Sequence, residues 1–204
     1  MKRLIIIISI FTLIASSCKV NKNLSTHDKG VVINGVKWAT RNVDNPGTFA
    51  KLSKDAGMLY QWDSKIGWSS TEPIVSTDGS FWNTSWNDGS SATSWQAANN
   101  ICPVGWRIPT KEEIESLVHS GSKWMKNGRL FGSDNNTLFL PAAGFRFDSG
   151  RLDKAGEYGY YWSSMSHKST EPSAYLLFFD SDDAYSSNDY SSAAYCVRCV
   201  AETY

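Results

Sequence analysis

Histidine is scarce in this sequence, and so are the short motifs that mark many enzymes. The three histidines, His27, His119 and His167, are scattered along 204 residues and do not predict a zinc site. The sequence has no G-x-S-x-G nucleophile elbow, no Walker loop and no glycine-rich dinucleotide fingerprint. We therefore predict that the protein is not an enzyme, holds no metal at a histidine site and needs no cofactor.

Net charge is lacking as well. Twenty Lys and Arg residues balance twenty Asp and Glu residues, and no basic stripe stands out. A nucleic-acid-binding protein needs such a stripe to neutralise phosphates, so we predict no nucleic acid partner. Aromatic residues, in contrast, are plentiful, since nine Trp, nine Tyr and nine Phe make up 13% of the chain. Rings at this density are typical of β-rich cores and recognition surfaces.

The first apolar run, residues 4–14, is too short to span a bilayer as a helix. It follows a basic start and precedes small residues, a pattern that predicts a lipoprotein signal peptide over residues 1–17. The small residues before Cys18 resemble a bacterial lipobox, so we expect a lipid to be attached to Cys18. An ordinary cleaved signal with a chance cysteine is the alternative. Lys19 argues against retention at an inner membrane.

Residues 18–30 are polar and lack periodicity, which predicts a flexible tether between the lipid and a single domain over residues 31–202. Two or more acyl chains give stable membrane attachment. We therefore expect a lipid-anchored protein of the outer membrane or cell surface.

Three further cysteines follow: Cys102, Cys196 and Cys199. The last two lie in residues 193–202, whose alternation predicts a C-terminal strand. On a strand they would be about 10 Å apart and on opposite faces, too far for a disulfide. Cys102 is therefore expected to pair with one of them, and the other is left as an odd thiol.

The stretch around Cys102 predicts a structural corner. Pro103 and Gly105 turn the chain, and Thr110 with Glu113 forms a capping box that starts a helix. The acidic residues after Thr110 suit the positive end of the helix dipole, so we interpret them as its solvated first turn. Nothing in this corner predicts a catalytic centre.

Other segments have clear local signals. Asn34-Gly35 between apolar runs predicts a β-hairpin with a type I′ turn. Sequence patterns predict helices over 94–100 and 110–121, strands over 137–147 and 174–181 (the second one central), and long loops over 63–91 and 180–195.

Several stretches together resemble the Fibrobacter succinogenes major paralogous domain family. They are "INGVKWATRNVDNPGTF", "GMLYQWDS", "CPVGWRIPTKEEIESL", "YGYYWSSMS", "AYLLFF" and "VRCV", and they cover about residues 31–202. The resemblance implies an α+β, C-type-lectin-like fold with two helices, a small, twisted, mostly antiparallel sheet and long loops. It also implies a disulfide between Cys102 and Cys199, because these occupy the family's recurrent cysteine positions. Cys196 departs from the family pattern.

Residues 181–195 contain only Ser, Asp, Ala, Tyr and Asn. Tyrosine provides rigid amphipathic area and the small polar residues provide adaptable hydrogen bonds, so this composition is typical of recognition loops. A solvated low-complexity loop is the alternative. The predicted ligand-binding residues are Tyr158, Tyr160, Asp182, Asp183, Tyr185, Asn188, Asp189 and Tyr190.

Calcium is a second hypothesis for this loop, because Asp180, Asp182, Asp183 and Asp189 place hard oxygen ligands within ten residues. A solvated acidic turn is the favoured interpretation, since no glycine makes the turn that a known calcium loop requires.

These observations lead to three functional hypotheses. The first is a membrane-anchored, surface-exposed lipoprotein that binds a glycan or protein ligand, or mediates adhesion, through its Tyr/Ser/Asn/Asp-rich loops. The second is a structural component of an envelope complex. The third is an enzyme related to formylglycine-generating enzymes, which share the lectin-like fold and use cysteines.

Overall fold

The computed structural model describes residues 27–202. The chain folds mainly into short strands, with 38% of residues in strands and 9% in helices. The strands are β1 (Val31–Ile33), β2 (Val36–Trp38), β3 (Met58–Gln61), β4 (Gly67–Ser69), β5 (Trp106–Arg107), β6 (Ser122–Met125), β7 (Gly128–Ser133), β8 (Asn136–Pro141), β9 (Phe145–Arg146), β10 (Leu152–Asp153), β11 (Gly159–His167), β12 (Ser173–Phe179), β13 (Ala184–Tyr190), β14 (Ala194–Tyr195) and β15 (Val200–Ala201). The helices are α2 (Trp82–Ser85), the 3-10 turn η1 (Ala97–Asn99) and α3 (Lys111–His119).

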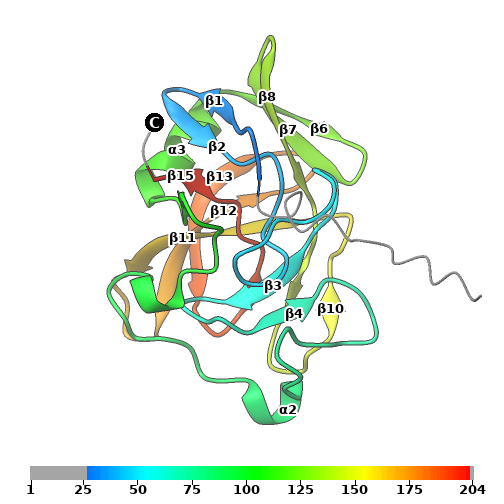
Figure 1. The fold of residues 1–204 in the computed structure, drawn as a ribbon, viewed down its shortest axis with the longest axis vertical. Coiled ribbons are helices and arrows are strands. Elements are labelled where there is room, and N and C mark those ends of the chain that lie inside the picture. Colours follow the sequence, from blue (N-terminus) through cyan, green and yellow to red (C-terminus); the bar gives the residue numbers. More distant parts are fainter. Residues whose placement is uncertain (1–26, 203–204) are drawn as a thin grey trace, which may run out of the picture.

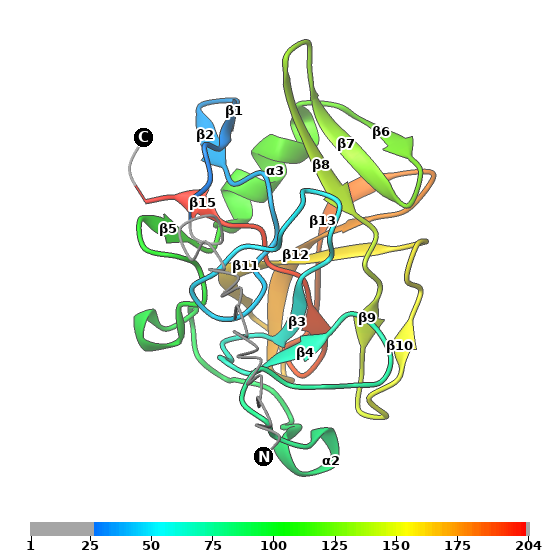
Figure 2. The ribbon, with the colours of Figure 1, turned by 45° about the vertical axis from the view of Figure 1, so that its right-hand side comes forward.

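These strands form four sheets, in the orders β1-β2-β15-β5, β10-β9-β14-β3-β4, β11-β12-β13 and β6-β7-β8. The expected α+β, C-type-lectin-like fold with one small sheet is therefore wrong. Figures 1 and 2 show the β6-β7-β8 sheet at one end of the molecule and α2 at the other.

Two local predictions are wrong, and the second accounts for part of the extra sheet content. The helix predicted over 94–100 shrinks to η1, because seven residues scarcely nucleate a helix and Gln96 and Asn99 donate hydrogen bonds to Asp63 instead. The loop predicted over 180–195 contains strand β13, which pairs along its whole length with β12. The loop predicted over 63–91 includes β4 and α2 and is otherwise irregular.

Three other predictions are confirmed. The β1–β2 hairpin turns at Asn34 and Gly35, both with positive φ, as a type I′ turn requires. Helix α3 starts at the Thr110–Glu113 capping box. Strand β12 is central, between β11 and β13.

The C-terminal segment is not the continuous strand expected over 193–202. It breaks between β14 and β15, where the backbone bonds to residues 39–43 instead, with Cys199 O accepting from Ala39 and Val197 O from Val43. The disulfide joins Cys102 to Cys199, which confirms the pairing that the resemblance implied. Cys196 is a buried free thiol.

The β11-β12-β13 sheet separates two apolar cores. One face carries Leu177 and Phe179, which pack in one core with Ile114 and Leu117 of α3. The other face carries Trp162 and Leu176, which pack in a second core with three aromatic side chains: Trp62, Trp95 and Tyr195.

The N-terminal end of the described chain is held against the domain. The buried Asp28 carboxylate accepts hydrogen bonds from Gly30, Thr40 and Arg41. The predicted signal peptide, the lipidation residue Cys18 and the tether up to residue 26 lie outside the described residues. Within residues 27–202, none of the helices is long and apolar enough to cross a membrane.

Candidate functional site

Strand β13 decides where the predicted ligand-binding residues lie. Side chains alternate along a strand, so Tyr185 and Asp189 point to one face of the sheet while Asn188 and Tyr190 point to the other. The side chains of Tyr185 and Tyr190 are 46% and 56% exposed, and they are the two most exposed tyrosines in residues 27–202. The single recognition loop that the sequence predicted is thus two separate surfaces.

The surface on the Tyr185 side is aromatic. Tyr158 and Tyr160 meet Phe178 of β12, with ring centroids 5.5 Å and 5.1 Å apart, and Phe178 meets Tyr185 at 5.2 Å. Two phenylalanines extend the cluster, since Phe145 lies 5.5 Å from Tyr160 and 4.8 Å from Phe147. We call these six residues the aromatic face. All except the exposed Tyr185 are half-buried.

A buried tyrosine supports the aromatic face from below. The ring of Tyr195 stacks on Tyr160 at 4.6 Å and 13°, and its hydroxyl donates a 2.6 Å hydrogen bond to Asp189. Burial and the nearby Asp189 carboxylate raise the pKa of Tyr160 to about 12, and the same causes raise the pKa of Tyr195. Both hydroxyls are therefore protonated at neutral pH, and the Tyr195 hydroxyl uses its proton in the bond to Asp189.

The second surface lies around Tyr190 and Asn188. They line a cavity of about 370 Å³ between the end of β13 and the turn that precedes β12. Its remaining lining residues are Ser169, Thr170, Glu171, Ser173 and Asp189. Most of its lining residues carry hydroxyl, amide or carboxylate groups, whereas the opposite face offers rings.

Asp182 and Asp183 belong to neither surface. They lie in the β12–β13 turn, where their backbone N–H groups donate to the Asp180 carboxylate. Asp189 is six residues further along an extended strand, about 20 Å from Asp183 at 3.3 Å per residue. Calcium binds its ligands at 2.3–2.6 Å, so the four aspartates of the calcium hypothesis do not share one ion. Among residues 27–202, no cluster of three metal-ligating side chains is present.

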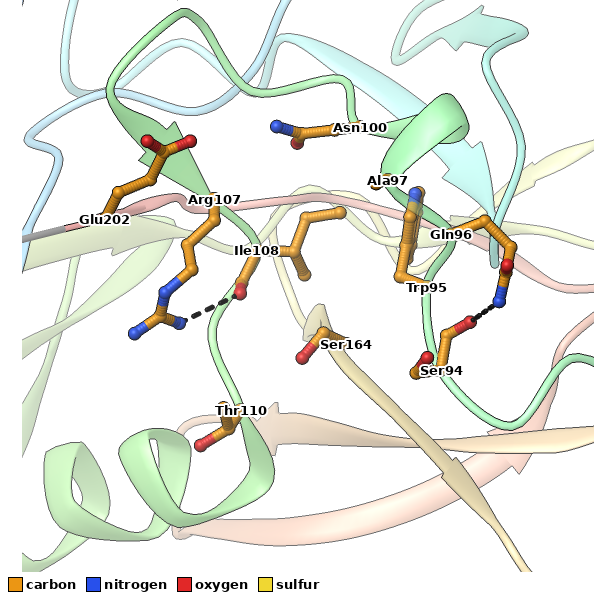
Figure 3. A pocket seen from close by; sticks show the side chains of 10 residues that line it. All are labelled: Ser94, Trp95, Gln96, Ala97, Asn100, Arg107, Ile108, Thr110, Ser164 and Glu202. Atoms are coloured by element: carbon orange, nitrogen blue, oxygen red, sulfur yellow. Dashed lines mark hydrogen bonds between the residues drawn. The ribbon is translucent and has the colours of Figure 1, made fainter.

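The corner around Cys102 forms one wall of a cleft that the sequence did not predict (Figure 3). The cleft has a volume of about 380 Å³, and Trp95, Asn100, Arg107, Ile108, Ser164 and Glu202 are among its lining residues. Two hydrogen bonds of 2.8 and 2.6 Å join the Arg107 guanidinium to Glu113 and raise its pKa. The positive charge of Arg107 is therefore balanced by Glu113, and the ion pair connects β5 to the start of α3. No local signal marks the cleft, because its walls come from distant segments.

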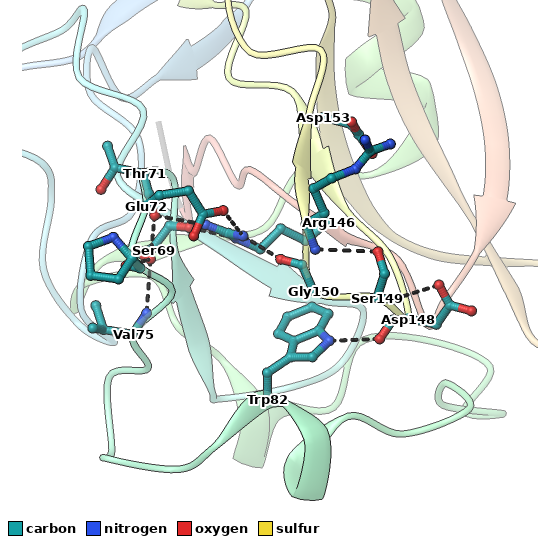
Figure 4. Close-up of polar contacts among 12 residues, drawn as sticks. Ser69, Thr71, Glu72, Val75, Trp82, Arg146, Asp148, Ser149, Gly150 and Asp153 are labelled. Carbon is teal, nitrogen blue, oxygen red and sulfur yellow. Dashed lines mark hydrogen bonds and ion pairs between the residues drawn. The ribbon is translucent and has the colours of Figure 1, made fainter.

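Arg146 is bonded both to the segment around the end of β4 and to its own β9–β10 hairpin (Figure 4). Its fully buried guanidinium pairs with Glu72 at 2.8 Å and donates to the carbonyls of Ser69, Thr71 and Gly150. Every one of these partners is a loop residue or the last residue of β4. The arginine thus ties the segment after β4 to the β9–β10 hairpin, which carries Phe145 and Phe147.

The free thiol of Cys196 is buried and hydrogen-bonded. Burial raises the pKa of Cys196 to about 12, and the thiol donates to the Ala56 carbonyl. Its neighbours Tyr161 and Arg198 are also fully buried, and Tyr161 donates to the Pro141 carbonyl. A thiol in this setting is protonated and inaccessible at neutral pH.

Comparison with known proteins assigns the family. A family model described as the Fibrobacter succinogenes major domain matches residues 17–201 of the 204. The chain belongs to this family. The match spans all fifteen strands of the Fibrobacter succinogenes major domain described here. No curated protein and no solved structure matches the chain.

Sequence reasoning missed three residues of this candidate site: Phe145, Phe147 and Phe178. Alternation along a strand would put Phe145 and Phe147 on one side, which is the only local signal, and the approach of Phe145 to Tyr160 depends on the pairing of β9 with β14. Phe178 was assigned to a strand that is apolar on both faces, and its partial exposure depends on which elements cover that strand.

Proposed function

We propose that this protein is a lipid-anchored binding module of the outer membrane or cell surface, and that its ligand, a glycan or a protein, contacts the aromatic face. The observation that carries the proposal is the group of partly exposed rings around Tyr160, supported from below by Tyr195. Sugars and polypeptides both bind to such surfaces through stacking and apolar contact, with phenol hydroxyls as polar handles.

The rings are held in place before any ligand arrives. Phe178 lies on a central strand, Arg146 fixes the hairpin that carries Phe145, and Tyr195 backs Tyr160. Preorganised side chains lose little conformational freedom on binding, which favours affinity. Membrane anchoring rests on the lipobox pattern at Cys18, which supports a location outside the cytoplasm.

Strand β13 provides a matched pair of variants for the test. Tyr185 and Tyr190 are both exposed and lie on the same strand, but only Tyr185 belongs to the aromatic face. On glycan and protein arrays, with calcium and with a chelator, we expect Tyr185→Ala to weaken binding by at least about tenfold, as for a central aromatic contact. Tyr190→Ala should stay within about twofold of the unmodified protein. Equal effects of the two substitutions would contradict the assignment.

Anchoring is tested separately. Cys18→Ser should move the protein from the membrane fraction to the soluble fraction, and surface exposure should allow protease or antibody to reach the domain on intact cells. If the Cys18→Ser protein remains in the membrane fraction, the lipid anchor is excluded, whatever the arrays show.

A further inference from the structure

Strand β13 is an edge of its sheet, and the opposite edge is capped. On the β11 side, Cys196 bridges the outer edge: its carbonyl accepts from Trp162 at 3.1 Å and its N–H donates to Tyr160 at 3.2 Å. Strand β13 pairs with β12 and, among residues 27–202, with no other strand. One edge of this sheet is therefore closed, and the other has no paired strand among residues 27–202, although α3 packs against β13.

The hydrogen bonds at both ends of β13 show which of its backbone groups point outward. Asp180 N–H donates to Asp183 O before the strand, and Ser191 N–H donates to Pro172 O after it. In an antiparallel ladder, directly opposed residues alternate between bonded and non-bonded pairs. The bonded residues on this strand therefore follow every second position from Asp183 to Ser191. They include Tyr185, Ser187 and Asp189, whose backbone groups bond to β12. Ser186 and Asn188 therefore direct their N–H and C=O groups away from the sheet.

The hydrogen bonds of β11, on the other side of β12, lead to the same alternation of bonded and outward-pointing residues. Tyr160 and Trp162 bond outward to Cys196, so their cross-strand partners Phe178 and Leu176 turn toward β13. No described residue outside the strand donates to or accepts from the backbone of Ser186 or Asn188.

Natural edge strands are commonly protected by charged residues (lysine above all), proline, a bulge, very short length or a covering element. Strand β13 has seven residues, contains neither lysine nor proline, and keeps an unbroken register with β12. Its one charged residue, Asp189, accepts a hydrogen bond from Tyr195 on the inner side of the sheet. An unprotected edge of this length beside an exposed tyrosine is suited to pairing with another chain.

We propose that β13 binds an extended, basic polypeptide segment that adds a strand to this edge. The main chain of the segment would bond to Ser186 and Asn188, and alternate side chains would lie against Tyr185. This inference rests on the proposed function and narrows its ligand to a polypeptide. The charge of the partner follows from carboxylates at both ends of the edge, Asp182 and Asp183 at one and Glu171 at the other, none of which forms an ion pair with a described residue. Arg129 reaches the first of these ends, but it donates to the backbone carbonyls of Asp180 and Asp183 and not to a carboxylate.

The test uses arrayed ten-residue peptides of random sequence, grouped by net charge, on the full mature protein. We expect binders among the positively charged peptides. Asn188→Pro deletes one outward N–H at an edge position where proline is tolerated, and it should weaken binding by about tenfold. The matched variant Asn188→Ala keeps that N–H and should bind within about twofold.

Amide hydrogen exchange provides a second measurement that does not depend on a variant. The outward amides of Ser186 and Asn188 should exchange rapidly in the free protein and slow by at least about tenfold when the selected peptide binds. The amide of Ser187, which bonds to β12, should be protected in both states.

The outcomes separate this inference from the proposed function. Glycan binding that is lost in Tyr185→Ala but kept in Asn188→Pro would leave the proposed function standing and overturn strand addition. Peptide binding without protection of Ser186 and Asn188 would also overturn it. A dimer of the protein alone, dissociated by Asn188→Pro in light scattering, would identify a second copy as the occupant and overturn the basic-polypeptide partner.

Discussion

The hydroxyl of Tyr195 donates a 2.6 Å hydrogen bond to the carboxylate of Asp189, while its ring stacks on Tyr160 at 4.6 Å. One buried side chain thereby joins β14 to the edge strand β13 and also supports the aromatic face. The candidate binding surface and the candidate pairing edge consequently depend on the same contact.

Tyr195→Phe should destabilise the protein by about 1–2 kcal/mol, because a half-buried carboxylate loses a hydrogen-bond donor. Tyr160→Phe is the matched control, since the Tyr160 hydroxyl forms no hydrogen bond with a described residue; its effect should stay within about 0.5 kcal/mol. Urea unfolding followed by fluorescence measures both. Equal losses of unfolding free energy in the two variants would show that the hydrogen bond from Tyr195 to Asp189 does not stabilise the protein.

Stability should decrease in alkaline solution. The pKa of Tyr160 is about 12 in the folded protein, against an ordinary value of 10.0. The unfolded state therefore loses this proton first, and the free energy of unfolding should fall as the pH rises from about 10 to about 12. Urea unfolding at pH 9 and pH 11 measures the loss, and Tyr160→Phe should reduce it. A loss that is unchanged in this variant would assign the effect to other groups.

Reduction of the disulfide should destabilise the protein by about 2–5 kcal/mol, because Cys102 and Cys199 are 97 residues apart and the bridge closes a long loop of the unfolded chain. Unfolding in urea with and without reductant measures this difference. The Cys102→Ala/Cys199→Ala protein should be insensitive to reductant, and sensitivity that persisted there would point to some other effect of the reductant.

Arg146→Lys should destabilise the protein by about 1–3 kcal/mol, because a lysine cannot donate to the three backbone carbonyls in the same geometry and leaves buried acceptors unpaired. It should also weaken ligand binding, since the hairpin that carries Phe145 loses its hydrogen bonds to the segment after β4. Arg151→Lys is the control: this exposed arginine of the same hairpin pairs with Asp153 at the surface, and its substitution should change stability by less than about 0.5 kcal/mol.

Cys196 should resist alkylation in the folded protein. With a pKa of about 12, roughly one thiol in ten thousand is ionised at pH 8, and that thiol is buried. Mass spectrometry after iodoacetamide treatment should find the residue unmodified without denaturant and fully modified in urea. Rapid labelling of the native protein would contradict the buried placement.

Much of the local structure was predictable from the sequence. The Asn34-Gly35 turn and the Thr110–Glu113 capping box each depend on residues no more than three positions apart in the chain, and both form as predicted. Strand β13 was not predictable in the same way, because serine, asparagine and aspartate have low strand propensity. Its backbone adopts an extended conformation because β12 beside it offers a complete row of hydrogen-bond partners.

The sequence by itself determined the cysteine at the corner, the capped helix, the central apolar strand and the abundance of tyrosine in the C-terminal part. Only the tertiary structure decided that Tyr185 and Tyr190 point to opposite faces, that Phe145 and Phe178 complete one surface with Tyr160, and that β13 has an open edge. The physical reason is that hairpins and helix caps form between near neighbours in the chain. The surfaces of this protein form where strands distant in the sequence pair, and where one strand ends the sheet without a neighbour.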